Sequence, residues 1–381
     1  MATAFRLGQR VPDASITVLE KESAVGQHQS GHNSGVLHAG TYYKPGSARA
    51  RLAVRGIRQM IEFCQQNDIP HEICGKLIVA SNESELSRLH SLYERGRQNG
   101  LKGLQLLTSG EMKEIEPHAA GVAALRVPEE GIVDYPKVCA VLAKKINGTV
   151  VTNARVKRLR PTNPGWIAET PAGDFECDLL VNCAGLHSDR ISELAGLRLD
   201  VRIVPFRGEY YKIKRERQYL VQNLIYPVPD PSFPFLGVHF TRLVRGGIEA
   251  GPNAVLAFAR EGYSKLDVNL RDLAGALSYP GLWRFLKKYP RMCAHELRRS
   301  FSKKLFCRSL RKLVPEIQVE DLEAGGSGVR AQVVSPSGEI MQDFDIRWHA
   351  DSVHVLSAPS PAATASLAIG EEIVDRLLSS H

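Results

Sequence analysis

Apolar and polar residues alternate along the chain with two periods, and these predict a mixture of strands and helices. A period of two with β-branched residues marks Ser15 to Leu19 (SITVL) as a strand. A helical period runs from Lys44 to Gln66, where the apolar residues form one stripe before Pro70. The run from Leu179 to Cys183 is apolar apart from Asn182, which is typical of a parallel strand buried on both faces.

Further elements follow from the same patterns. We expect a hairpin from Trp166 to Thr170 and Asp174 to Leu180, and a strand-rich, proline-rich region from Arg202 to Thr241. A last helix is expected from Ala362 to Leu378, directly after Pro361, which suits the first turn of a helix. Alternating strands and helices of this kind predict an α/β chain.

The segment from His28 to Ser47, HQSGHNSGVLHAGTYYKPGS, is rich in Gly, Ser, His and Asn. It follows Glu20, which ends the first strand. In dinucleotide-binding folds such an acidic residue hydrogen-bonds a ribose hydroxyl of the cofactor, and small residues let backbone N–H groups approach a phosphate or flavin. An ordinary polar loop after an edge strand has the same composition, so the strand and Glu20 alone leave both interpretations open.

The sequence resembles the L-2-hydroxyglutarate oxidase/dehydrogenase family, FAD enzymes of the D-amino-acid-oxidase-like superfamily. The resemblance begins with LEKE (Leu19 to Glu22) and the His28–Ser47 segment. It continues through eight further blocks in the family's order: Cys74–Ala80, Gly131–Tyr135, Val181–Ser192, Ile203–Tyr211, Tyr226–Thr241, Gly251–Tyr263, Gly328–Gln332 and Ala358–Gly370. It implies FAD as cofactor and an α/β fold, in which a Rossmann-like FAD-binding domain carries an inserted antiparallel-sheet substrate domain.

The sequence departs from the family at its start. The family opens with a strand, a G-x-G-x-x-G turn and a helix, whereas only nineteen residues precede Glu20 here and Gly8 is the one glycine among them. Ala2 to Pro12 corresponds at most to the tail of that helix. The turn normally holds the cofactor's pyrophosphate, and the strand normally lies inside the parallel sheet. We therefore expect the first βα unit to be missing and its neighbouring strands to keep unpaired backbone groups.

Composition narrows the class of protein. The 381 residues are 43% hydrophobic and 24% charged, as in ordinary globular proteins, and the length suggests two domains. No apolar run of about 18 residues predicts a membrane-spanning helix, and the N-terminus shows no secretory signal. Seven scattered cysteines without a C-x-x-C favour a reducing compartment, with neither disulfides nor a metal site. We expect a cytoplasmic protein, or a mitochondrial one if the chain is eukaryotic and has lost a presequence.

The net charge of +8 is concentrated in one segment. Between Arg284 and Lys312 eleven Lys/Arg residues stand against one acid, Glu296. Leu297 and Phe301 recur near helical spacing, which predicts a basic amphipathic helix. A solvated helix face explains this pattern, and so does contact with an anionic membrane from which a quinone takes electrons. Nucleic-acid binding is not expected, because no binding module or stacking aromatics accompany the charge.

The oxidation implied by the resemblance requires cations for the substrate carboxylates, a base for the hydroxyl proton and a flavin close to the substrate carbon. The resemblance assigns Arg330 to a substrate carboxylate, and Arg207 is a weaker candidate for the distal carboxylate. For the base, His239 ranks first and His38 second, with His187 third; each is also consistent with a structural histidine. The candidate hydroxyl donors are Tyr42, Tyr43 and Tyr226, although tyrosines are as often residues of the core.

The resemblance also implies the cofactor contacts and the division into domains. The expected contacts are Glu20, Ser30, Asn33, Ser34, Gly35, Val156, Ala184, Gly185, Gly328, Ser360, Pro361 and Ala362. The expected FAD-binding domain comprises residues 1–73, 140–200 and 316–381. The expected substrate domain comprises residues 74–139 and 201–315.

Three functions remain open on the sequence alone. The first is FAD-dependent oxidation of L-2-hydroxyglutarate to 2-oxoglutarate, with oxygen or a quinone as electron acceptor. The second is a related FAD oxidase of another 2-hydroxy or amino acid. The third is a truncated, catalytically impaired paralogue that binds a dicarboxylate or a partner, which the missing glycine turn favours.

Overall fold

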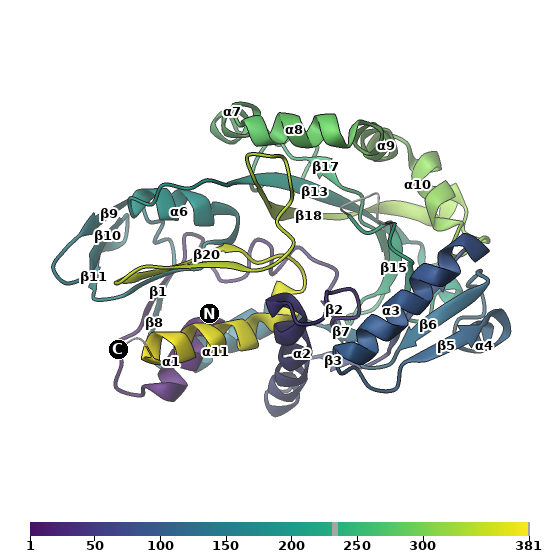
Figure 1. Cartoon of the computed structure of the whole chain (residues 1–381), viewed down its shortest axis with the longest axis horizontal. Coiled ribbons are helices and arrows are strands. Elements are labelled where there is room, and N and C mark those ends of the chain that lie inside the picture. The colour runs from purple at the N-terminus through teal and green to yellow at the C-terminus, as the bar shows by residue number, and fades with distance from the viewer. Residues whose placement is uncertain (231–234, 380–381) are drawn as a thin grey trace.

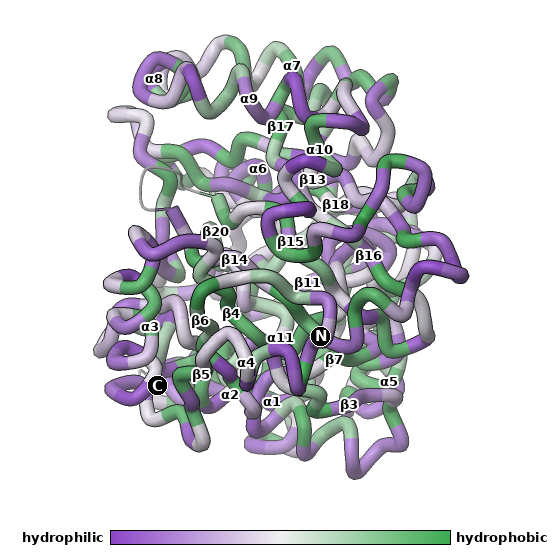
Figure 2. Tube along the Cα trace, turned by 90° about the vertical axis from the view of Figure 1, so that its right-hand side faces the viewer, coloured by the Kyte–Doolittle hydropathy of each residue, from purple (hydrophilic) through white to green (hydrophobic). Residues whose placement is uncertain are grey.

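The computed structural model describes residues 1–230 and 235–379 and shows a broad curved sheet with helices on either side (Figure 1). The helices are α1 (Ala2–Arg10), α2 (Ala48–Gln66), α3 (Leu86–Gln98), α4 (Ser109–Ile115), α5 (Tyr135–Lys145), α6 (Ser188–Leu194), α7 (Leu270–Leu277), α8 (Pro280–Lys288), α9 (Pro290–Phe301), α10 (Lys303–Leu310) and α11 (Ala362–Ser379). Helices α7, α8 and α9 follow one another along one side of the molecule, opposite α1 and α11 (Figures 1 and 2).

The largest sheet has the order β17-β13-β16-β15-β14-β4-β6-β5, and β18 also pairs with β13. Its strands are β4 (Lys76–Ala80), β5 (Gln105–Thr108), β6 (Ala123–Val127), β13 (Arg202–Ile213), β14 (Leu224–Pro227), β15 (His239–Arg242), β16 (Ile248–Gly251), β17 (Val255–Leu256) and β18 (Leu322–Val334). Only the β14–β4 pair is parallel within this described sheet. The strand-rich region expected after Arg202 thus forms a mainly antiparallel sheet.

Two parallel pairs stand beside the large sheet. Strand β1 (Thr17–Leu19) pairs with β8 (Thr149–Val151), and β12 (Leu180–Asn182) pairs with β20 (Ser352–Ser357), which continues antiparallel to β19 (Asp345–Trp348). In the described part of the chain these pairs belong to separate sheets. Two small antiparallel sheets complete the strands: β2 (Val36–Leu37), β7 (Gly131–Val133) and β3 (His71–Glu72); and β9 (Arg158–Pro161), β10 (Trp166–Thr170) and β11 (Gly173–Cys177).

Close packing of helices fixes the lower layer in Figure 1. Helix α11 lies against α1, and a Cβ on Gly370 would come within 2.8 Å of the Ala2 backbone. On its other side α11 meets α2, where a Cβ on Gly56 would lie 2.5 Å from the Ala365 Cα. Since no side chain fits at either crossing, these glycines let the three helices bring their backbones together.

Most of the expected elements are confirmed, together with the α/β class. Strand β1, the hairpin β10–β11 and helix α11 lie where the patterns placed them. The long helix is shorter than expected: α2 begins at Ala48 rather than Lys44, because the Ser47 hydroxyl accepts the Ala50 N–H at 3.1 Å and caps the helix.

The prediction of one basic helix between Arg284 and Lys312 is wrong. The segment contains the end of α8 and the whole of α9 and α10. Pro290 lacks an N–H and disfavours a helical residue before it, so α8 ends ahead of it. Ser302 then separates α9 from α10, and its hydroxyl accepts the Leu305 N–H at 3.3 Å as the cap of α10. Within the described residues no helix is long and apolar enough to cross a membrane.

Candidate active site

A cleft of about 2270 Å³ is lined both by the large sheet and by the two parallel pairs. Pockets for small molecules usually measure roughly 300–1,000 Å³. The larger volume leaves room for a big cofactor and a substrate side by side.

This cleft brings together nearly all the residues proposed from the sequence. Its lining includes the cofactor candidates Glu20, Ser30, Asn33, Ser34, Val156, Ala184, Gly185, Gly328, Ser360, Pro361 and Ala362. It also includes the substrate and base candidates His38, Tyr42, Tyr43, His187, Tyr226, His239 and Arg330. Gly35 and Arg207 are not among its lining residues. Segments from both ends and the middle of the chain therefore meet at one place.

Asn33 shapes the loop between β1 and β2. Its side-chain amide donates to the Gln29 and Ser30 carbonyls at 2.9 and 2.8 Å, and its carbonyl oxygen accepts the Gly35 N–H at 2.8 Å. These bonds hold the backbone of a segment that has no helix or strand hydrogen bonds of its own. A polar residue chosen as a cofactor contact thus has a structural role in holding the loop.

Two glycines let this loop approach the rest of the cleft wall. Gly185 has a φ of +57°, and a Cβ there would lie 2.8 Å from the Gln29 side-chain oxygen. At Gly328, in β18, a Cβ would overlap the His32 carbonyl oxygen. These close contacts tie the loop to the Ala184–Gly185 turn and to β18 along one wall of the cleft.

The start of α11 is fixed from the side. The Arg49 guanidinium donates through Nε to the Ser360 carbonyl at 2.7 Å and lies 4.3 Å from the centre of the Tyr43 ring. The Thr364 hydroxyl accepts the His38 N–H at 3.2 Å. The N-terminus of α11, with its partial positive charge, is thereby joined to the loop that carries His38.

His239 and His38 both contact the Tyr226 ring. His239 is buried and donates from Nδ1 to the Gly237 carbonyl at 2.9 Å, so its Nε2 is left as an acceptor. Burial lowers the pKa of His239 to about 3 despite that carbonyl, which acts in the opposite direction. His38 has its Nδ1 3.5 Å from a carboxylate oxygen of Glu130.

The two arginines, Arg330 and Arg207, differ in how far their guanidinium groups are engaged by other protein groups. Arg330 lines the cleft, and its one described hydrogen bond runs to the Asn253 carbonyl at 3.4 Å. Arg207 is buried, pairs with Glu209 at 2.9 Å and donates to the Ser264 carbonyl at 2.7 Å. Its role toward a distal carboxylate stays a prediction, which this pairing does not support.

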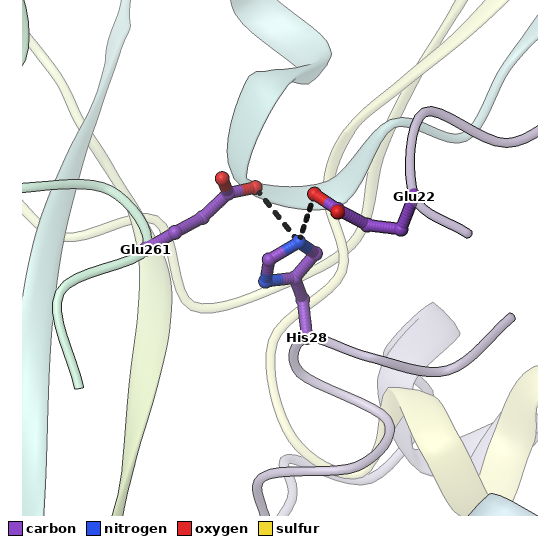
Figure 3. Close-up of side chains that lie close together, drawn as sticks. All are labelled: Glu22, His28 and Glu261. Atoms are coloured by element: carbon purple, nitrogen blue, oxygen red, sulfur yellow. Dashed lines mark hydrogen bonds and ion pairs between the residues drawn. The ribbon is translucent and has the colours of Figure 1, made fainter. Parts of the chain in front are cut away.

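Glu22, His28 and Glu261 lie close together (Figure 3), and His28 and Glu261 line the cleft. His28 Nε2 lies 2.9 Å from Glu22 and 3.2 Å from Glu261. The Lys21 ammonium, 2.8 Å from both His28 Nε2 and Glu261, also contacts Glu22. Since the chain's own cation occupies the position that a metal ion would take, we interpret the group as an ion-pair network. His187 extends it, with Nε2 3.1 Å from Glu261.

Sequence reasoning missed two charged residues behind the cleft, Lys76 and Glu130. Both side chains are fully buried and form an ion pair. Lys76 begins an apolar strand in CGKLIVA and Glu130 precedes GIVDY, so each belongs to or adjoins a block that the resemblance singled out. The signal available in the sequence was Lys76, a charged residue at the start of an otherwise apolar strand.

Comparison with known proteins gives one consistent family. The model of the FAD dependent oxidoreductase family (DAO) matches residues 1–376. An L-2-hydroxyglutarate dehydrogenase from Indibacter alkaliphilus is 51% identical over 379 residues, which cover 98% of this chain and 95% of that protein. The L-2-hydroxyglutarate dehydrogenase of Escherichia coli K12 is 42% identical, with 99% and 90% covered. The mitochondrial L-2-hydroxyglutarate dehydrogenase of Homo sapiens is 43% identical, with 99% and 86% covered.

Solved structures show the same fold at lower identity. An L-alpha-glycerophosphate oxidase from Mycoplasma pneumoniae, solved with FAD bound, superposes with a TM-score of 0.77 at 22% identity, covering 99% of this chain and 91% of that one. Glycine oxidase from Geobacillus kaustophilus gives a TM-score of 0.73 at 20% identity, with 98% and 91% covered. At such identities the likeness concerns the arrangement of strands and helices alone.

Proposed function

The chain belongs to the FAD dependent oxidoreductase family, and from that premise we propose that it oxidises L-2-hydroxyglutarate to 2-oxoglutarate. The protein is an oxidoreductase that acts on a CH–OH group with FAD as cofactor. The resemblance seen in the sequence is thereby confirmed. The observation that carries the substrate is the relatives' shared name at 42–51% identity over nearly the whole chain.

The cleft fits the cofactor. Its glycine-lined wall, at Gly185 and Gly328, has no room for a Cβ. We propose that the loop around Ser30 and Ser34, the Ala184–Gly185 turn and the N-terminus of α11 hold FAD, with Glu20 toward the ribose. Bound FAD supplies the acceptor for the two electrons that leave the substrate.

Arg330 is the cation proposed for a substrate carboxylate. It reaches the cleft from β18, next to the glycine wall, and its described partner is a weakly bonded carbonyl 3.4 Å away. A guanidinium with donors to spare can bind a carboxylate through two parallel hydrogen bonds. Tyr226 and Tyr43 also line the cleft, and we assign them to its wall.

Oxidation of the alcohol removes the hydroxyl proton and the hydrogen on the same carbon with its two electrons, leaving a carbonyl. We propose His38 as the acceptor of the hydroxyl proton. The nearby Glu130 carboxylate compensates the positive charge that forms on its ring. His239, ranked first from the sequence, resists protonation where it is buried. We assign its Nε2 to hydrogen bonding with the substrate.

The outer surface of α7, α8 and α9 supports delivery of electrons at a membrane. Trp283, Leu297 and Phe301 are 55%, 55% and 75% exposed there, among the basic residues between 284 and 312. Exposed apolar side chains with surrounding cations favour peripheral contact with an anionic membrane. We propose that a quinone in such a membrane takes the electrons, with oxygen as the alternative acceptor.

We retain the division into an FAD-binding domain and a substrate domain as a proposal. The large sheet belongs mainly to the proposed substrate domain. Strand β18, assigned from the sequence to the FAD-binding domain, pairs with β13 along its length. Arg330 on β18 thus lies in a strand that joins the two parts.

The visible spectrum of the purified 381-residue protein tests the function. Flavin bands that bleach without oxygen on addition of L-2-hydroxyglutarate, and not with the D enantiomer, are the expected result. A flavin that bleaches only with an amino acid or another 2-hydroxy acid would indicate the related-oxidase alternative.

A catalytically impaired paralogue is the second candidate. The observation that favours it is the separation of the β1–β8 and β12–β20 pairs, which belong to different sheets in the described part of the chain. A colourless protein that FAD cannot reconstitute would support this candidate over the enzyme.

A further inference from the structure

Lys76 and Glu130 form an ion pair with no solvent exposure of either side chain. Moving two charges out of water costs several kcal/mol per ion, and an apolar pair of similar volume would fill the same space. The burial of both charges therefore indicates that they act on a neighbouring group. The nearest candidate is His38, whose Nδ1 lies 3.5 Å from Glu130 Oε2.

The backbone and two aromatic rings hold this pair in place. Glu130 accepts the Ala39 N–H through Oε1 at 3.2 Å, so the carboxylate is fixed to the residue after His38. The Lys76 ammonium lies 4.5 Å from the centre of the Tyr42 ring and 4.9 Å from that of Tyr226. Ring faces attract a cation, and they shield Lys76 from the cleft.

We propose that Lys76 and Glu130 are positioning residues that orient His38 toward the cleft and set its affinity for a proton. This inference rests on the proposed function, in which His38 accepts the hydroxyl proton of the substrate. Nδ1 is the ring nitrogen near the buried carboxylate, and His38 lines the cleft, so we assign Nε2 to the cleft side. Protonation of Nε2 makes the ring an imidazolium whose charge Glu130 stabilises, while Lys76 limits that stabilisation.

The electrostatics favour the ionised form of Glu130. Burial raises the pKa of Glu130, but the charge of Lys76 and then His38 outweigh it and lower the pKa to about 2. Burial lowers the pKa of Lys76, against Glu130. Groups that face His38 from other elements, or act on its neighbours, are Tyr226 on β14, His239 on β15, Thr364 on α11, and Arg330 on β18, which acts on His239.

An NMR titration of the full chain with ¹³C-labelled histidine rings tests the proposal without substrate. The His38 signal is identified by its loss in His38→Gln. We expect Glu130→Gln to weaken proton binding by His38 about tenfold or more, because a carboxylate at this distance shifts a pKa by 1–3 units. Lys76→Met is expected to strengthen proton binding by His38. The opposite signs would not arise from a purely structural role.

Glu129→Gln is the matched control, because Glu129 is adjacent in sequence but partly exposed and paired with Arg58. Its His38 titration should equal that of the parent. Changes below twofold in both test variants, or changes of the same sign, would overturn the proposal. If a single variant fails to fold, Lys76→Met combined with Glu130→Gln leaves no lone buried charge. In it His38 should still bind protons more weakly than in the parent, and an unchanged titration would equally overturn the idea.

The pH dependence of turnover separates this proposal from the proposed function. A parent that does not oxidise L-2-hydroxyglutarate would contradict the function, while the titration still decides the role of the pair. In an active parent, the pH at which kcat reaches half its maximum should move in Glu130→Gln as the His38 titration does.

Discussion

The rings of His239 and Tyr226 stack with their centroids 3.8 Å apart and their planes inclined by 25°. His38 meets the same tyrosine edge-on, at 6.4 Å and 72°. One buried aromatic ring thus contacts both histidines of the cleft. Burial keeps one of them, His239, neutral, and the other, His38, lies near a carboxylate.

The first prediction concerns acid stability. Since the pKa of His239 is about 3 in the folded protein and about 6.5 in an unfolded chain, the unfolded state binds more protons between these values. Protonation therefore favours unfolding, and stability falls as pH decreases from 6.5 toward 3. Between pH 7.5 and 5.0 this one group should cost about 2 kcal/mol of unfolding free energy.

Urea unfolding of His239→Gln at both pH values measures this effect. The variant should lose about 2 kcal/mol less than the parent on acidification, whatever its stability at pH 7.5. His90→Gln, at an exposed histidine, should behave as the parent does. An unaltered pH dependence in His239→Gln would show that the parent's acid sensitivity arises elsewhere.

The second prediction concerns Arg330. Arg330→Ala should raise KM for L-2-hydroxyglutarate by about 10- to 100-fold, because a hydrogen-bonded charge contributes roughly 1.5–3 kcal/mol. Arg330→Lys should recover part of this, since it keeps the charge but loses the paired donors. Steady-state kinetics and flavin absorbance measure both properties. Flavin content should stay nearly unchanged, and the exposed Arg198→Ala should match the parent. Unchanged kinetics in Arg330→Ala would remove the assigned role.

The sequence predicted features that depend on local pattern or on motif. The Ser15–Leu19 strand and the helix from Ala362 were predicted because alternation and an N-terminal proline act over a few residues. The glycine- and serine-rich loop was placed at the cleft through the resemblance, because its composition alone also suits an ordinary polar loop. The resemblance then brought distant segments to one cleft.

Features that depend on distant partners were not predictable in this way. Arg207 was expected in the cleft, but its guanidinium is taken up by Glu209 and the Ser264 carbonyl, a pairing set by how β13 meets a loop 57 residues later. Lys76 and Glu130 were missed because charged residues are almost never fully buried unless paired. Local pattern does not show that β4 pairs with β6, or that the loop after β6 brings Glu130 next to Lys76.

The third prediction compares two glycines on β18. Gly328→Ala should displace the loop that carries His32, because the added Cβ overlaps the His32 carbonyl, whereas a Cβ on Gly326 meets open space. The first variant should therefore lose most of its bound flavin, while Gly326→Ala should retain the parent's. The ratio of visible to ultraviolet absorbance of each purified protein measures this. Equal flavin content in the two variants would contradict the proposed position of the cofactor wall.

The fourth prediction concerns the outer surface of α8 and α9. Trp283 and Phe301 are large, exposed and close in sequence to exposed Arg291 and Arg298. The parent should sediment with vesicles of phosphatidylglycerol more than with vesicles of phosphatidylcholine, and less as salt rises, because screening weakens surface charge. Each basic residue near an anionic surface contributes about 1 kcal/mol, so Arg291→Ser and Arg298→Ser should each weaken binding about fivefold.

The apolar part of this surface is tested separately from its charge. Trp283→Ser with Phe301→Ser should reduce vesicle binding while leaving its salt dependence in place, because insertion of rings into the interface is a hydrophobic contribution. Tyr219→Ser is the matched control, since Tyr219 is 54% exposed but belongs to the segment Arg215–Leu220 ahead of β14 and not to these helices. Parent protein that does not sediment with anionic vesicles, or does so independently of salt, would remove the membrane surface from the proposal. Oxygen would then become the favoured electron acceptor.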